Sequence, residues 1–141
     1  MRSRERISFQ TQDIVLVLKE KNKIRQWIVD AIKNESKKTG DITCIFCSDE
    51  YLLSMNQQYL HHDDYTDVIT FDYTEGDRIS GDIFMSVERI LDNSIQLKTT
   101  PEEELHRVMI HGVMHLCGYK DKLPKERANM TKKEDQYLKI F

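Results

Sequence analysis

The segment from residue 100 to residue 118 constrains the fold most, because it predicts a helix that is apolar nearly all round. Thr100, Pro101 and Glu103 occupy the N-cap, N1 and N3 positions of a helix start with a capping box. The apolar residues that follow are Leu105, Val108, Met109, Ile110, Gly112, Val113, Met114, Leu116 and Cys117. A helix of this composition is buried, so other elements must cover it on several sides.

Two histidines lie in this apolar helix, and a glycine and an aspartate follow them. His111 and His115 are four residues apart, so they lie on one face of the helix. Gly118 can take the left-handed conformation that ends a helix, and the chain can then return Asp121 to that face. Two imidazoles, a carboxylate and an open position form the catalytic type of zinc site. We therefore predict that His111, His115 and Asp121 hold one Zn2+ per chain; the alternative is a pair of core histidines bonded to the backbone.

The spacing of this motif is similar to that of zinc metalloproteases whose helix reads H-E-x-x-H-x-x-G-x-x-H. In those enzymes the glutamate that follows the first histidine is the general base. The corresponding position here is Gly112, which cannot take up a proton. The sequence therefore disfavours peptide hydrolysis by that route.

The rest of the chain predicts short strands and amphipathic helices in mixed order. We expect strands at residues 6–10, 41–47, 68–71 and 81–85, the last two forming a hairpin. We expect helices at residues 21–38, ended by Gly40, at 48–59, from Ser86 onward, at 100–118 and at 124–139. Residues 14–18 are apolar, but the segment is too short to assign. A small mixed four-stranded sheet covered by about five helices, of the α/β or α+β class, would bury these apolar stripes and place the metal site on a buried helix.

Length and composition suit one domain that covers residues 1–141. Apolar residues make up 39% of the chain and charged residues 32%, as in a water-soluble globular protein. The sequence contains no long apolar run that would span a membrane and no secretory signal, so we expect no membrane partner and a cytoplasmic location. The net charge of −3 is unusual for a nucleic-acid-binding protein. Arg2, Arg4 and Arg6 form one weak basic cluster, and a solvated terminus explains it equally well.

The three cysteines do not predict a disulfide framework. Cys44 and Cys47 form a C-x-x-C pair, but they lie in the strand expected at residues 41–47. Side chains three apart on a strand point to opposite faces, so the pair is poorly placed to bind zinc. We expect these cysteines to pack in the core.

Several motifs of this chain together resemble the YbeY family of bacterial metal-dependent endoribonucleases of rRNA maturation. The family signature H-G-x-x-H-L-x-G-Y is matched at residues 111–119, and the family sequence T-D-V-L-S-F is similar to residues 66–71. Asn56 with Tyr59, and Gly81-Asp82-Ile83, match two further family motifs. The resemblance implies an α/β fold with the metal helix at the edge of a cleft, and single-stranded RNA in that cleft. It also implies a role in rRNA maturation and ribosome quality control, with the small ribosomal subunit as partner.

This chain departs from the family pattern at two positions. The third metal ligand of the family is a histidine, whereas this chain has Asp121, which is also a competent zinc ligand. Lys120 and Lys122 flank Asp121 and are poor metal ligands. The family has an arginine linked to substrate handling where this chain has Leu60. His61 or His62 could contact phosphate in its place, or could belong to a solvated polar loop.

Two acidic residues are candidates for supporting roles in RNA phosphodiester hydrolysis. Asp67 could be the general base or support the site, and it could equally be a capping or turn residue. Glu104 lies seven residues before His111 on the same helical face, so it could orient His111 or simply complement the helix dipole. The alternative functions are a non-catalytic ribosome-assembly factor with a structural metal and a metallohydrolase that acts on a non-RNA substrate. The acidic net charge favours these alternatives.

Overall fold

The structure, a computed structural model, describes residues 6–60 and 66–141. Within these ranges the chain forms four strands and five helices. In chain order they are β1 (Arg6–Thr11), α1 (Lys21–Asn34), β2 (Lys38–Cys47), α2 (Asp49–Leu60), β3 (Val68–Asp72), β4 (Arg78–Ser86), α3 (Val87–Gln96), α4 (Pro101–Leu116) and α5 (Pro124–Leu138). The predicted elements are thus all present, and residues 14–18 belong to neither a helix nor a strand.

The four strands form one mixed sheet in the order β1-β2-β4-β3. Strand β2 pairs in parallel with β1 and with β4, and β3 pairs antiparallel with β4. The predicted hairpin of the third and fourth strands is therefore confirmed, and so is the predicted mixed sheet. None of the helices in the described ranges is long and apolar enough to cross a membrane.

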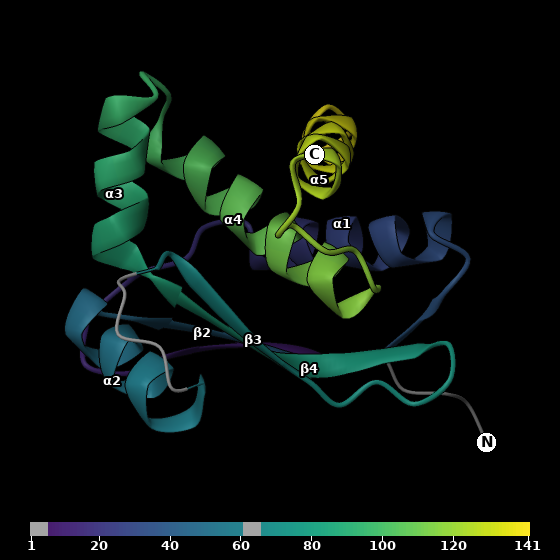
Figure 1. The fold of residues 1–141 in the computed structure, drawn as a ribbon, viewed down its shortest axis with the longest axis horizontal. Coiled ribbons are helices and arrows are strands. Elements are labelled where there is room, and N and C mark those ends of the chain that lie inside the picture. Colours follow the sequence, from purple (N-terminus) through teal and green to yellow (C-terminus); the bar gives the residue numbers. More distant parts are fainter. Residues whose placement is uncertain (1–5, 61–65) are drawn as a thin grey trace.

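Helices cover the two faces of the sheet unequally. Figure 1 shows α1, α4 and α5 on one side of the sheet and α2 on the other. The main core lies between the sheet and the first group, and α4 contributes the largest share of it. Its buried apolar side chains include Val108, Met109, Ile110, Val113, Met114 and Leu116. The near-continuous apolar surface of α4 is explained by these neighbours, because β4, α3, α5 and α1 all contact it.

The cysteine pair in β2 confirms the prediction of opposite faces. Cys44 belongs to the main core, whereas Cys47 packs with Leu52 and Ile69 in a smaller cluster under α2. Both thiols are free and fully buried. Burial raises the pKa of each of them to about 12.

The first helix is shorter than predicted, because Gly40 does not end it. Helix α1 ends at Asn34, and Ser36 takes the left-handed conformation, with φ of 61°. The amide of Lys37 donates to the carbonyl of Ile32 and that of Ser36 to the carbonyl of Lys33, which is a Schellman ending made without glycine. Gly40 lies instead within β2, where an added Cβ would be 2.9 Å from the carbonyl oxygen of Ile79. Glycine is therefore needed there for close packing against β4.

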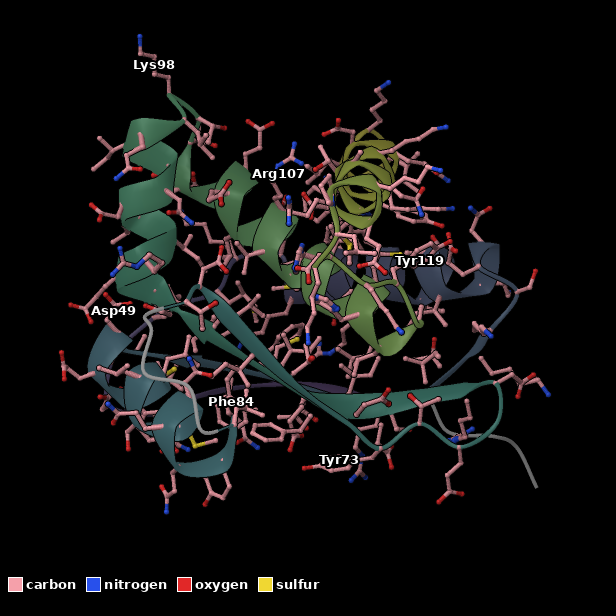
Figure 2. The ribbon with its side chains drawn as sticks, viewed as in Figure 1. Asp49, Tyr73, Phe84, Lys98, Arg107 and Tyr119 are labelled. Carbon is pink, nitrogen blue, oxygen red and sulfur yellow. The ribbon has the colours of Figure 1, made fainter. Side chains whose placement is uncertain are left out.

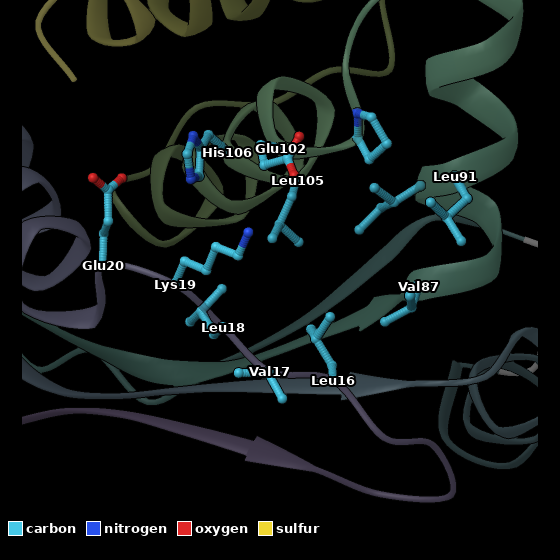
Figure 3. A pocket seen from close by; sticks show the side chains of 12 residues that line it. Leu16, Val17, Leu18, Lys19, Glu20, Val87, Leu91, Glu102, Leu105 and His106 are labelled. Carbon is cyan, nitrogen blue, oxygen red and sulfur yellow. The ribbon is translucent and has the colours of Figure 1, made fainter.

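An apolar groove of about 330 Å³ lies between residues 16–20 and the helices α3 and α4 (Figure 3). Leu16, Ile90 and Leu105 are among its lining residues, and His106 lies at one side. The groove contains none of the three predicted metal ligands. Its lining is mainly apolar, and the predicted ligands converge in a different, more polar cleft.

Candidate metal centre

Helix α4 holds His111 and His115 close against the sheet. Its start is capped as predicted, because the Thr100 hydroxyl accepts a hydrogen bond of 3.1 Å from the amide of Glu103. Gly112 lies between the histidines and faces β4, where an added Cβ would be 2.6 Å from Cγ2 of Ile83. Position 112 therefore points into the core and not into the cleft. A glutamate at this position could not act as the general base that it is in the H-E-x-x-H proteases. This supports the prediction that the chain does not hydrolyse peptides by that route.

The two histidines and Asp121 converge on one point. The Nε2 atoms of His111 and His115 are 3.1 Å apart, and Oδ2 of Asp121 is 3.1 Å from the first and 3.2 Å from the second. Ligand atoms around a tetrahedral zinc ion, with bonds of about 2.0–2.1 Å, lie about 3.3 Å apart. The three atoms thus have the chemistry and nearly the spacing of a zinc triad. Each side chain is partly exposed, which leaves access for a further ligand.

The turn after α4 brings Asp121 to the histidines in the predicted way. Gly118 has φ of 108°, a conformation that favours glycine. The amide of Tyr119 donates to the carbonyl of Met114, so the turn is a second Schellman ending. The Tyr119 hydroxyl then donates a 2.6 Å hydrogen bond to Glu35 at the end of α1. This contact anchors the segment that carries Asp121, and Figure 2 shows Tyr119 near the ends of these helices.

Glu134 on α5 holds the other nitrogen of His111. Its Oε2 lies 2.6 Å from Nδ1 of His111, and its Oε1 accepts a 2.9 Å bond from Arg107. Figure 2 shows Arg107 on α4, at the side that faces α5. A carboxylate on Nδ1 keeps the proton there and leaves the Nε2 lone pair for a metal ion. The sequence analysis missed Glu134, although an acidic residue in the buried stripe Met130, Glu134, Tyr137 was the available signal.

The electrostatic surroundings of His111 favour positive charge. Burial by itself lowers the pKa of His111, but the hydrogen bond to Glu134 and the charges of Glu134, Asp121 and Asp67 outweigh it. The pKa of His111 in the metal-free chain therefore lies above its ordinary value. A cation bound at Nε2 would benefit from the same negative charges, and it would compete with the proton.

Glu104 does not take the position next to His111 that the sequence suggested. Seven residues on a helix bring a side chain back to the same face, but about 10.5 Å further along the axis. Within residues 6–60 and 66–141, the ring nitrogens of His111 contact Glu134, His115 and Asp121. Glu104 is instead 4% exposed and hydrogen-bonds the Asn93 side chain, and its Oε1 has no partner within those residues. Burial and the charge of Asp67 raise the pKa of Glu104.

Asp67 lines the same cleft as the candidate triad, just before β3. Its Oδ2 accepts a 3.3 Å hydrogen bond from the Asn93 amide, and its backbone oxygen accepts one from the amide of Ser86. Burial raises the pKa of Asp67, and the nearby charge of His111 offsets this only in part. Asp67, unlike Glu104, is thus among the residues that line this cleft.

The cleft has a volume of about 460 Å³ and a mixed polar and apolar wall. Its lining residues are Asn56, Leu60, Thr66, Asp67, Val68, Ile69, Thr70, His111, His115, Asp121 and Lys122. Leu60, which stands where the family motif has arginine, thus reaches the cleft without a charge. Arg2, Arg4, His61 and His62 lie outside the described residues. Arg6 is exposed at the start of β1.

Fold and site together define an α/β protein with a candidate two-histidine, one-carboxylate metal triad in an open cleft. Comparison with known proteins identifies the family within this class. The family model described as "Endoribonuclease YbeY" matches residues 6–141. The chain therefore belongs to the endoribonuclease YbeY family, and the resemblance seen in the sequence is confirmed.

Curated relatives match the chain over nearly the whole length of both proteins. "Endoribonuclease YbeY" of Flavobacterium psychrophilum is 50% identical over 135 residues, which cover 96% of each chain. The protein of the same name from Parabacteroides distasonis is 49% identical, covering 96% of this chain and 95% of the relative. A solution structure of a Thermotoga maritima protein is 28% identical with a TM-score of 0.65, covering 94% of this chain and 87% of that one.

Proposed function

We propose that this chain is a metal-dependent endoribonuclease that cleaves single-stranded RNA and acts in rRNA maturation and ribosome quality control. The observation that carries the proposal is the convergence of His111, His115 and Asp121 in an open polar cleft. Membership of the endoribonuclease YbeY family supports the substrate class. We further propose one Zn2+ per chain at this triad, the small ribosomal subunit as partner, and a cytoplasmic location.

The residues of the cleft fit this chemistry in distinct ways. A zinc ion held by the triad would supply Lewis acidity to this cleft. Nε2 of each histidine and Oδ2 of Asp121 would hold the ion, and Glu134 would keep the proton of His111 on Nδ1. Asp67 holds or accepts a proton at its carboxylate, because burial raises its pKa and makes the carboxylate a better proton acceptor. The Asn93 amide orients that carboxylate.

Two alternative functions make different predictions. A structural metal in an assembly factor would need closed coordination, whereas the side chains of His111, His115 and Asp121 are 21%, 25% and 34% exposed. This access favours the catalytic form. A metallohydrolase acting on another substrate is favoured only by the acidic character of the chain, whose net charge is −3.

The decisive experiment measures cleavage of a fluorescent single-stranded RNA by the zinc-loaded chain. His115→Ala should abolish both zinc retention and cleavage, while His106→Gln, a control on the same helix outside the cleft, should retain both. Circular dichroism establishes that each variant is folded. A folded, zinc-loaded wild-type chain that leaves RNA intact, alone and with small ribosomal subunits, would refute the ribonuclease. Co-sedimentation with small subunits that persists in folded His111→Ala would then favour the assembly factor.

A further inference from the structure

The cleft beside the candidate metal triad has little positive charge for a site that holds RNA. Among its described lining residues, Asp67 and Asp121 are acidic, and Lys122 is the single lysine or arginine. Glu134 adds a further carboxylate behind His111. Each phosphate of an RNA strand is anionic, so binding next to these carboxylates is favoured by a cation in the cleft besides the proposed metal ion.

The backbone of Lys122 is fixed at the edge of the cleft. Its amide donates a 3.2 Å hydrogen bond to Oε1 of Glu126, and Nη1 of Arg127 donates to its carbonyl oxygen. Both partners lie at the start of α5, in the capping arrangement that begins this helix. Lys122 also directly follows Asp121, so its backbone position is tied to that of a candidate metal ligand.

The amine of Lys122 is available to an anionic ligand. No salt bridge to Lys122 is found within residues 6–60 and 66–141, whose ion pairs involve other cations. A lysine amine is a compact charge on a flexible stem, which suits a phosphate oxygen without demanding bidentate geometry. Lys120, on the other side of Asp121, is also exposed but does not line the cleft. The two lysines thus differ in that only Lys122 lines the cleft.

We propose that Lys122 is the phosphate-binding cation of this cleft and holds the RNA backbone next to the metal triad. The proposal rests on the ribonuclease function proposed above. Leu60 lines the same cleft and brings no charge, so within the described lining the task falls to Lys122. This residue would set the preference of the site for a polyanionic strand over a neutral substrate.

The test compares Lys122→Gln with its neighbour Lys120→Gln and with Lys122→Arg. Binding of a 2′-O-methyl oligouridylate to each zinc-loaded chain is measured by fluorescence anisotropy over a series of salt concentrations, and gels establish that the probe stays intact. One lost phosphate contact should reduce the slope of log K against log salt by about 0.7 for a single strand. We expect this reduction, and weakening on the order of tenfold at low salt, in Lys122→Gln alone.

Each outcome bears on a definite claim. Equal slopes and affinities in the two glutamine variants, with zinc content unchanged, would overturn the assignment of Lys122 while leaving the ribonuclease intact. Restoration of the wild-type slope in Lys122→Arg would support a role of charge. A slope that depends on Lys122 in a zinc-loaded chain that cleaves no RNA would refute the proposed ribonuclease and not the phosphate contact. If the wild-type chain does not bind the probe, the phosphate contact is refuted.

Discussion

Glu134 is not one of the three proposed metal ligands, but we expect it to control the metal affinity of the triad. Two donors converge on its carboxylate, Nδ1–H of His111 at 2.6 Å and the guanidinium of Arg107 at 2.9 Å. A glutamine in its place offers only one acceptor oxygen to these two donors. If its NH2 group faces His111, the proton of the imidazole must move from Nδ1 to Nε2. It would then occupy the atom that we assign to the metal.

The expected size of this effect follows from the position of the carboxylate. The Glu134 side chain is only 8% exposed, so water cannot readily replace the lost acceptor. Partners of this kind typically change metal affinity by about 10- to 100-fold, equivalent to about 1.4–2.7 kcal/mol. We expect Glu134→Gln to fall in this range. Asp135→Asn removes the other carboxylate bound by Arg107, at an exposed position, and should change zinc affinity by less than about twofold.

The assay is competition for Zn2+ between each variant and a chromophoric chelator. Nitrogen NMR of His111 in the metal-free chain reports the tautomer directly, and urea unfolding shows whether the variants are folded. Wild-type zinc affinity in folded Glu134→Gln would refute the reasoning. So would an unchanged Nδ1–H tautomer accompanied by weakened binding, because the tautomer would then not be the cause.

Three further predictions concern packing and titration elsewhere. Gly112→Ala should lower the free energy of unfolding by about 1–2 kcal/mol, because overpacking against Ile83 exceeds the gain in helix propensity. In a double-mutant cycle with Ile83→Ala, the double variant should lose less unfolding free energy than the sum of the two single losses. Burial opposes ionisation of Glu35, but hydrogen bonds from two tyrosines and a lysine outweigh it and lower the pKa of this carboxyl. The ionised carboxylate therefore stabilises the folded chain above the ordinary pKa of glutamate, and this stabilisation is lost as the pH falls through the lowered pKa of the folded state. Melting temperatures should therefore fall less in acid for Glu35→Gln than for the wild type. The thiols of Cys44 and Cys117, whose pKa burial raises to about 12, should resist iodoacetamide until the chain is unfolded; alkylation of the folded chain, followed by mass spectrometry, would contradict this.

Local patterns were sufficient to predict most of the elements and the three candidate ligands. The ligands lie within eleven residues of one another, on one helix and the turn that ends it, so helical periodicity and one glycine relate them in space. Where the pattern was ambiguous, local reasoning failed. Gly40 is a common type of helix stop, but a serine at position 36 ends α1, and the close approach of β4 explains the glycine.

The residues that orient the candidate ligands could not be predicted in this way, because they contact the ligands from distant parts of the chain. The sequence by itself determined that α4 is buried, that His111 and His115 share a face, and that Asp121 can join them, because these relations follow from local backbone geometry. Only the tertiary structure decided that Glu134, 23 residues beyond His111, holds its Nδ1, and that Glu104 does not. That choice depends on how α5 crosses α4, which periodicity within one helix cannot determine.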